Sequence, residues 1–560
     1  MRAGLTILVA VGTVAGTTTF VASVGVAPAN AQATYPTYLC SNFCDGRDPA
    51  LAAGDRIGET DMFDGRTVNL HFDDADDMAW ASIDGGTPGD QVWMDRSFDG
   101  GYDWSPYGSK LGQTTIPAGD TGWRTLMYNL DEFSSLRPLE GVVRACGETG
   151  STISCTPWAR TTWNAANNQR AAATALMEFY DIGNGGGNPS LGGSQLFDHF
   201  TGVTSTNTAG DGFSWWMSAN DLTAIIDNIR IANMASYQPV IGWIYAANRP
   251  AGAGGSTGDV FGDFKNHFID DTGWWAMAWI DAYDLTGDSF YLTTAEDDAN
   301  YMNSFWDSTC GGGVWWSDSK TYKNSIANEL DLYVNAALHN LIPGDTTYLN
   351  QALNEWNWLD TTSGLLNSSF LFEDGEVPVS SGSTACTIGT HTQTFTYNQG
   401  VILEGLAELY KATGNVSYLN DGEALANAST TAPTLQVNGE LAEPNDTAAD
   451  TATSTDANAP MFKGAYIRGL MMLNSALASA NSTAAGPFSC YLAKQSAVAY
   501  LNARNPADQY GYLWAGPWTT PDQPTSGQQG SALFLANAGP AFTSPSDPAV
   551  QSALTCSLTG

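Results

Sequence analysis

The feature that most constrains the fold of this chain is a change in hydrophobic spacing near residue 165. Before it, short alternating runs such as 67–72 and 91–94 are separated by turns rich in Gly, Pro and Asp, which is typical of a small all-β domain of the sandwich type. After it, about eleven segments have helical spacing. They lie near 171–180, 215–235, 270–286, 290–306, 322–341, 347–359, 396–412, 416–428, 461–480, 488–503 and 528–538.

The helical segments also repeat. Residues 282–292 are similar to 408–419: each has a helix end, a glycine at the C-cap and a Tyr-Leu pair that opens the next helix. Repeated hairpins of about eleven helices fit an (α/α)6 barrel, whereas an open solenoid usually has a tighter repeat. We therefore predict a mainly α fold with this barrel at 165–560, preceded by an all-β accessory domain at 32–164. The Thr-, Ala-, Asp- and Asn-rich segment 431–459 is expected to be a long loop within the barrel.

The first 31 residues have the pattern of a secretory signal peptide. Arg2 is followed by an apolar run from Leu5 to about Val26 and by a small-x-small cleavage pattern at 29–31. No later stretch approaches the ~20 apolar residues that span a bilayer. We therefore expect a secreted, extracellular protein that is not embedded in a membrane.

The charge balance limits the possible partners. Acidic residues outnumber basic ones by 58 to 21, which gives a net charge of -37. A protein that binds phosphates needs Lys and Arg, so nucleic acid is excluded as a partner. The composition suits a soluble exported protein that acts on a neutral substrate. We expect a monomer, although the sequence does not reveal the oligomeric state.

Eight cysteines in an exported chain indicate disulfides. Short spacings favour Cys40–Cys44 and Cys146–Cys155, and Cys490–Cys556 would fasten the last helices to the C-terminus. Cys310 and Cys386 are then left for each other, although spacing alone does not settle the connectivity. The chain has five His and no CxxC pair, so no metal site is expected.

One pair of adjacent carboxylates has a setting suited to catalysis. Asp270 and Asp271 precede the apolar run 272–279 and would occupy the first turn of a helix, where neighbouring side chains point about 100° apart. The helix N-terminus favours the ionised form and apolar surroundings favour the protonated form, so the pair could supply both an acid and a nucleophile. An alternative is a pair of helix caps. The other acidic pairs, at 73–74, 76–77 and 297–298, are expected on solvated surfaces.

Several motifs together resemble glycoside hydrolase family 76, the α-1,6-mannanases. They occur in the family's order and cover about 165–540: Trp216-Met-Ser-Ala-Asn220, Asp270-Asp-Thr-Gly-Trp-Trp-Ala-Met-Ala-Trp279, Cys310-Gly-Gly-Gly-Val-Trp-Trp316, Lys323-Asn-Ser-Ile-Ala-Asn-Glu-Leu330, Thr396-Tyr-Asn-Gln-Gly400 and Phe462-Lys-Gly464. The resemblance implies an (α/α)6 barrel and retaining hydrolysis of α-1,6-mannan without a cofactor or required metal. It also implies that Asp270 is the nucleophile and Asp271 the general acid/base.

The motifs and the paired tryptophans further suggest sugar contacts. The expected contact residues are Trp216, Asn220, Trp274, Trp315, Trp316, Asn324, Asn328, Tyr397, Asn398 and Gln399. Some have structural alternatives, since Asn324 and Asn328 could cap or bridge helices and Gly311–Gly313 could only shape a turn. Lys463 and Arg468 could be structural ion-pair partners.

Two other functions remain open from the sequence. Related fungal wall proteins are thought to be transglycosylases that cut mannan and rejoin it to another acceptor, which product analysis with excess acceptor would reveal. A wall-binding protein without catalysis is the other alternative, and the intact Asp270–Asp271 pair argues against it. Two features depart from the family: Gly273 stands where an aliphatic residue is common, and the β region lies outside the resemblance.

Overall fold

The protein is described by a computed structural model that carries side chains. It describes residues 38–556 except 40–42, 75, 99–100, 102–103, 105–107, 132–140, 162–166, 181–196, 198–214, 253–259, 448–457, 481–482, 484, 506–507 and 519–524. The expected signal peptide, 1–31, therefore lies outside the described residues.

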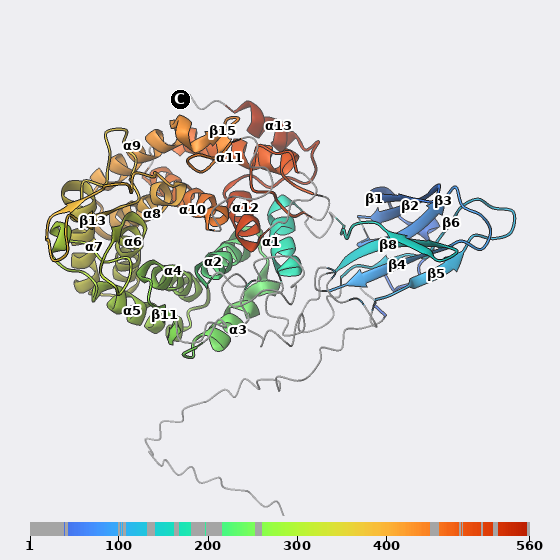
Figure 1. The fold of residues 1–560 in the computed structure, drawn as a ribbon, viewed down its shortest axis with the longest axis horizontal. Helices are drawn as coiled ribbons and strands as arrows, with labels where there is room; N and C mark the ends of the chain where they lie inside the picture. Colours follow the sequence, from blue (N-terminus) through green and yellow to red (C-terminus); the bar gives the residue numbers. More distant parts are fainter. Residues whose placement is uncertain are drawn as a thin grey trace, which may run out of the picture.

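Residues 43–161, here called the β unit, form two antiparallel sheets (Figure 1). The first contains β1 (Arg56–Phe63), β2 (Arg66–Asp73), β3 (Met78–Asp84), β6 (Trp123–Arg124) and β7 (Tyr128–Asn129). The second contains β5 (Leu111–Thr115), β4 (Gln91–Ser97), β8 (Val142–Thr149) and β9 (Thr152–Cys155). Alternate residues of β2, β3, β4 and β8, such as Leu70, Ala81, Met94 and Ala145, form one buried apolar cluster. The period-two spacing of the sequence thus produces a shared core.

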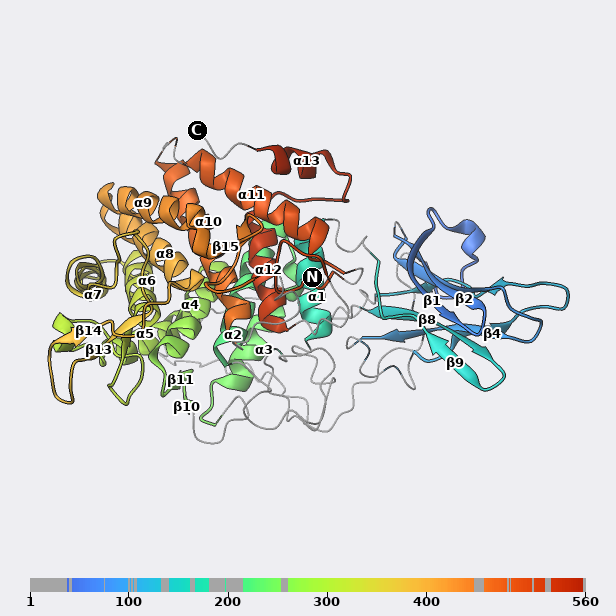
Figure 2. The same ribbon diagram turned by 45° about the horizontal axis from the view of Figure 1, so that its top comes forward.

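In the helical part of the described chain, six helices form a closed ring (Figures 1 and 2). They are α2 (Trp215–Ala232), α4 (Ile269–Thr286), α6 (Ser325–Leu341), α8 (Thr396–Thr413), α10 (Ala459–Ser479) and α12 (Ser526–Ala538). Each packs against the next, and α12 returns to α2. Their buried apolar side chains belong to one continuous core.

A second layer of helices surrounds this ring (Figure 1). It consists of α1 (Asn168–Phe179), α3 (Gln238–Asn248), α5 (Ser289–Asn303), α7 (Thr347–Asn357), α9 (Ser417–Thr431) and α11 (Ala485–Asn502), with α13 (Pro548–Thr555) packed on α11. The expected mainly α fold is confirmed. The sequence did not predict α3 or α13. Helix α3 carries a proline and several β-branched and aromatic residues, which weaken the helical signal, and α13 is only eight residues long.

Short strand pairs lie in the connections between these helices. They are β10 (Val260–Gly262) with β11 (Lys265–Asn266), β12 (Lys323–Asn324) with β13 (Gly375–Pro378) and β14 (Cys386–Thr387), and β15 (Gln436–Val437) with β16 (Glu440–Leu441). The last pair belongs to the polar segment 431–459, which joins α9 to α10. This segment therefore connects a helix of the outer layer to a helix of the ring, as expected of a loop within this part of the chain.

Three of the expected disulfides are present: Cys146–Cys155, Cys310–Cys386 and Cys490–Cys556. Cys44 is also disulfide-bonded, while its expected partner Cys40 is outside the described residues. None of the described helices is both long enough and apolar enough to cross a bilayer.

Some acidic residues expected on solvated surfaces are buried instead. Asp73 accepts a hydrogen bond from the amide of Ala53, and Asp77 accepts one from the hydroxyl of Thr161. Asp298 is fully buried on α5. The expectation was wrong because adjacent acids in a sequence do not reveal which of them turns towards the protein.

Candidate active site

The ring brings the N-terminal ends of its helices together, because an outer helix returns the chain between successive inner ones. Trp216 of α2 packs against Trp274 of α4, with ring centroids 5.6 Å apart, and against Phe462 of α10 at 5.9 Å. Tyr397 of α8 stacks on Phe462 at 3.9 Å. One aromatic cluster thus joins four helix N-termini, and the motifs recognised in the sequence meet there.

Asp270 and Asp271 lie in the first turn of α4, as the sequence predicts. Asp270 accepts a hydrogen bond on each carboxylate oxygen: from the indole Nε1 of Trp316 at 3.1 Å and from the amide of Asp271 at 3.1 Å. Asp271 accepts one at 2.6 Å from the side-chain amide of Asn266. Both aspartates are partly exposed residues rather than buried ones.

The surroundings of the pair favour retention of a proton. Burial raises the pKa of Asp270 well above its ordinary value, and the charge of Asp271 raises it further. Burial also raises the pKa of Asp271, to about 7. Because the two groups interact, these shifts belong to the pair rather than to one residue. Both shifts are upward, so the pair keeps a proton to a higher pH than two free aspartates would.

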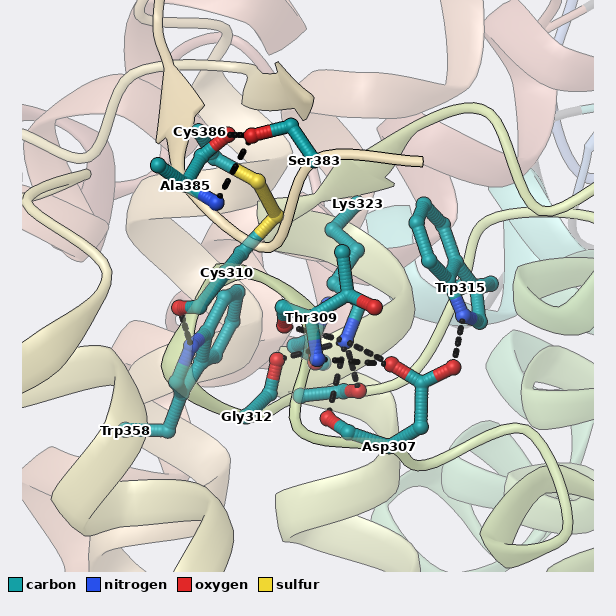
Figure 3. Close-up of a disulfide and its surroundings, with 12 residues drawn as sticks. Asp307, Thr309, Cys310, Gly312, Trp315, Lys323, Trp358, Ser383, Ala385 and Cys386 are labelled. Carbon is teal, nitrogen blue, oxygen red and sulfur yellow. Dashed lines mark hydrogen bonds and ion pairs between the residues drawn. A yellow bond between two sulfur atoms is a disulfide. The ribbon is translucent and has the colours of Figure 1, made fainter. Parts of the chain in front are cut away.

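Trp316, which donates to Asp270, directly follows the loop 307–315. Hydrogen bonds from a buried side chain and a disulfide hold this loop in place (Figure 3). The buried ammonium group of Lys323 donates to the carbonyl oxygens of Thr309 at 2.8 Å, Gly312 at 2.6 Å and Gly313 at 2.7 Å, and to Asp307. Cys310 ties the same loop to Cys386.

The three glycines of this loop have positive φ angles, which L side chains rarely adopt. Gly311–Gly313 and Lys323 therefore shape the turn that presents Trp316 to the acids.

Several predicted contact residues are engaged inside the protein. Asn324 caps α6 by accepting from the amide of Ala327, and Asn328 bridges both backbone groups of Val314. Trp315 donates a hydrogen bond to Asp307, and Asn220 donates one to the carbonyl of Trp216. The side-chain amide of Gln399 bonds both backbone groups of Phe372. The side chains of these five residues therefore stabilise the structure around the site through hydrogen bonds to other protein groups.

The other predicted contact residues divide by exposure. Trp274 and Asn398 are buried, and the side-chain amide of Asn398 has no hydrogen-bond partner in the described part of the chain. Trp216, Trp316 and Tyr397 are partly exposed at the shared helix ends. These three are the predicted residues best placed to touch a ligand.

Sequence reasoning missed two residues beside the acids. Tyr322 packs against Trp316 and donates a hydrogen bond at 2.5 Å to the carboxylate of Asp374. The charges of Asp374 and Asp270 both raise the pKa of Tyr397, which places Asp374 near the pair. Asp374 precedes a glycine after a short apolar run, as an ordinary turn residue does, so no pattern distinguished it.

No set of residues in the described chain resembles a metal centre. Two groups bring three potential ligand atoms together: Asp95 with Cys146 and Cys155, and Glu376 with Cys310 and Cys386. Both pairs of cysteines form disulfides, so their sulfur atoms are not thiolates.

The chain is similar to curated fungal proteins. It is 28% identical over 237 residues to the mannan endo-1,6-alpha-mannosidase DFG5 of Saccharomyces cerevisiae, covering 39% of this chain and 49% of that protein. It is 26% identical over 261 residues to the mannan endo-1,6-alpha-mannosidase DCW1 of Candida glabrata, covering 42% and 54%. The chain thus spans about half the length of the curated relatives it matches.

Solved structures share the fold of much of the chain. An inactive variant of the α-1,6-mannanase GH76A of Salegentibacter sp. HEL1_6, in complex with α-1,6-mannotriose, has a TM-score of 0.53 at 22% identity and covers 66% of this chain and 97% of that one. The model of glycosyl hydrolase family 76 matches residues 162–547, which include all six ring helices and the carboxylate pair. The chain belongs to glycosyl hydrolase family 76.

Proposed function

We propose that this protein is a secreted endo-α-1,6-mannanase that cleaves mannan with retention of configuration on an (α/α)6 barrel. The carboxylate pair at the start of α4 carries the proposal, because glycoside hydrolysis needs two carboxyl groups that differ in protonation. Family membership and relatives named for the same linkage support this substrate.

The hydrogen bonds support a division of roles between the two acids. Burial raises the pKa of Asp270, but two N–H groups point at its carboxylate and stabilise the charge it needs when it attacks the anomeric carbon and forms a glycosyl ester. Asp271, with one N–H donor, carries the proton and delivers it to the departing glycosidic oxygen. In the second step Asp271 accepts a proton from water, the water attacks the anomeric carbon, and Asp270 is released.

Proposed sugar contacts follow the exposure of the aromatic side chains. Trp216, Trp316 and Tyr397 offer ring surfaces beside the acids, and the aliphatic faces of a sugar ring pack on such surfaces. Asp374 offers a carboxylate oxygen for a sugar hydroxyl. The protein acts as a monomer, and these groups require no cofactor or metal.

The decisive experiment is digestion of linear α-1,6-mannan followed by sizing of the products. An endo-acting enzyme releases oligosaccharides of several lengths from the start, and proton NMR of fresh products shows the α-anomer first. The matched control is the variant Asp270→Asn with Asp271→Asn, which keeps side-chain shape and removes the acid chemistry. Release of mannose alone would exclude endo action, and an initial β-anomer would exclude retention. Equal cleavage by wild type and control would place catalysis elsewhere.

A further inference from the structure

We propose that the β unit carries a second, non-catalytic site that binds a neutral polysaccharide chain. The site is a cleft, here called the outer cleft, on the face of the β1–β2–β3–β6 sheet that points away from the shared apolar core. The inference rests on the proposed function only in its choice of α-1,6-mannan as the first polymer to test.

Strand alternation builds the floor of the outer cleft. Leu70 and Ala81 point into the core, so their neighbours His71, Trp80 and Ser82 point to the opposite face. His71 and Trp80 are cross-strand partners whose rings stack at 4.9 Å. Hydrogen bonds between His71 and Asp55 at 2.7 Å and between His71 and Ser82 at 2.9 Å hold this stack in place. The floor is therefore held in one conformation, with Trp80 almost fully covered.

The walls make this surface concave. One wall comes from the segment 48–55 and the other from β5 and residues 123–126, and together they enclose a cavity of about 1160 Å³. At the rim, Trp123 is 44% exposed and Leu126 is 45% exposed. Large side chains exposed beside a hollow usually mark a binding surface.

The lining has the two features that recognise a sugar. The indole of Trp123 offers a flat apolar face for the C–H side of a pyranose ring. Around it, Asp84, Gln113 and Arg124 supply acceptors and donors for paired hydroxyl groups. Arg124 is held in position by an ion pair with Asp48 at 3.0 Å. A groove with one apolar wall and several polar groups suits an oligosaccharide better than an apolar ligand.

The charge of the outer cleft selects against polyanions. Its carboxylates, from Asp48, Asp55 and Asp84, outnumber the guanidinium group of Arg124. Nucleic acids and phosphorylated glycans would be repelled. The neutral class is therefore the one that fits. All residues that line the cleft lie outside residues 162–547, the part that matches the family model and contains Asp270 and Asp271.

The test measures binding of the full chain with the acids neutralised, as Asp270→Asn with Asp271→Asn, so that polymer is not consumed. Affinity electrophoresis in gels containing linear α-1,6-mannan gives the dissociation constant. We expect Trp123→Ala to raise it about tenfold, which corresponds to the loss of one aromatic contact. Gln113→Ala, an exposed change on β5, should raise it by a smaller factor. Trp123→Phe should retain most of the affinity because it preserves a flat ring.

The matched control is Ile153→Ala, because Ile153 is 53% exposed on β9 and does not line the cleft. It should bind like the parent chain, and unchanged melting temperatures should show that all variants are folded. If Trp123→Ala and Gln113→Ala both bind the polymer with the dissociation constant of the parent chain, the proposal is overturned. The gels are repeated with β-1,4-mannan, xylan and β-1,3-glucan. If binding to one of these polymers depends on Trp123, and the wild-type chain with both acids intact does not cleave α-1,6-mannan, the cleft is upheld and the proposed function is rejected. Failure to bind any of the four polymers would reject the cleft.

Discussion

At the residue scale, the environments of Asp270 and Asp271 differ although the two are adjacent. Asp270 accepts from Trp316 and from a backbone amide, whereas Asp271 accepts from Asn266. Hydrogen bonds to a carboxylate stabilise its charge, so the residue with more donors is better suited to be the nucleophile. This difference leads to two predictions about the roles of the acids.

The first prediction separates the acids by leaving group. Asp271→Ala should nearly abolish mannan cleavage yet still release nitrophenol from an activated α-mannoside, because that leaving group needs no proton. Asp270→Ala should lose both activities, since no acid replaces a missing nucleophile. The measurement is the initial rate of each variant on both substrates.

Added azide provides a control on the stereochemistry of this experiment. It should give α-mannosyl azide with Asp271→Ala, because azide then displaces Asp270 from a covalent intermediate with a second inversion. It should give β-mannosyl azide with Asp270→Ala, by one direct displacement. Survival of nitrophenol release in Asp270→Ala but not in Asp271→Ala would show that the roles are reversed.

The second prediction concerns Trp316, whose indole N–H favours the ionised form of Asp270. Trp316→Phe keeps a ring against Phe268 but removes the donor. The pKa of Asp270 should then rise, and a higher pH is needed to ionise the nucleophile. The acid limb of the kcat/KM profile should therefore move to higher pH, by about one unit for an interaction of ~1.4 kcal/mol. Trp315→Phe is the control, because Trp315 donates to Asp307 instead. An unmoved acid limb in Trp316→Phe would refute this role.

At the element scale, the ring depends on close contacts that only glycine permits. A Cβ atom on Gly469 of α10 would lie 1.9 Å from the carbonyl oxygen of Gly400 on α8. A Cβ on Gly400 would lie 2.2 Å from the Cα of Tyr466. The helices therefore touch backbone to backbone, and neither can give way through a flexible side chain.

The third prediction follows from this contact. Gly469→Ala should lower the free energy of unfolding by about 3 kcal/mol or more, because α8 and α10 must separate. Gly486→Ala on α11 has nothing within 4 Å of the added atom and should stabilise by about 0.5–1 kcal/mol through helix propensity. Thermal unfolding of both variants tests the pair. A similar melting temperature for both would show that the packing of α8 on α10 is looser than described.

The same comparison shows what the sequence could reveal. Helical spacing and the Gly-Tyr-Leu hairpin signals located most helices, and the first-turn position of Asp270 followed from the apolar run behind it. Close approach of distant elements left no local signal. Gly273 looked like a weak point in its helix, but a Cβ there would meet Leu330 of α6 and Met302 of α5 at 2.9 Å. The glycine is needed for packing, which no propensity scale reports.

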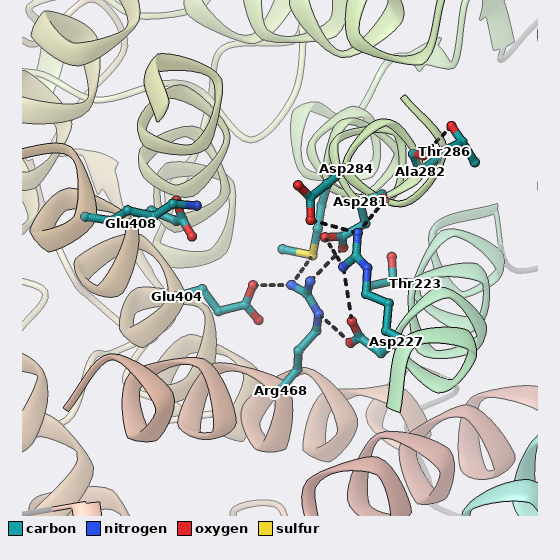
Figure 4. A network of polar contacts seen from close by, with 12 residues as sticks. Thr223, Asp227, Asp281, Ala282, Asp284, Thr286, Glu404, Glu408 and Arg468 are labelled. Atoms are coloured by element: carbon teal, nitrogen blue, oxygen red, sulfur yellow. Dashed lines mark hydrogen bonds and ion pairs between the residues drawn. The ribbon is translucent and has the colours of Figure 1, made fainter. Parts of the chain in front are cut away.

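At the scale of the whole molecule, one buried arginine connects four helices of the ring (Figure 4). The guanidinium group of Arg468 on α10 contacts Asp227 of α2 at 3.1 Å, Asp281 of α4 at 2.6 Å and Glu404 of α8 at 2.5 Å. The sequence analysis named Arg468 as a possible structural ion-pair partner, and these three contacts give it that role. Three acids converge on Arg468, and Arg230 lies 3.6 Å from Asp281 and 3.9 Å from Asp227. Removal of Arg468 therefore leaves three buried acids with only Arg230 as a neighbouring cation among the described residues.

The fourth prediction is that Arg468→Met destabilises the whole ring, and does so more at high pH. Breaking a buried ion pair by removing one partner costs about 3–5 kcal/mol. Burial already raises the pKa of Glu404 to about 8 and that of Asp281 to about 6 while Arg468 is present, and without its positive charge both values rise further. In the variant the folded state therefore binds more protons than the unfolded chain between about pH 4 and 8, where unfolded carboxyl groups are ionised. Stability then falls as pH rises through that window.

Melting temperatures at pH 5 and pH 8 measure this effect, with Lys411→Met as the control. Lys411 is an exposed cation that faces Glu408 at 3.4 Å, and such pairs contribute about 0–1 kcal/mol. We expect the deficit of Arg468→Met relative to wild type to be several degrees larger at pH 8 than at pH 5, and the deficit of Lys411→Met to stay small at both. A deficit of Arg468→Met that is independent of pH would mean that lost packing, rather than uncompensated charge, destabilises the ring. A variant as stable as wild type would show that the six helices do not depend on this network.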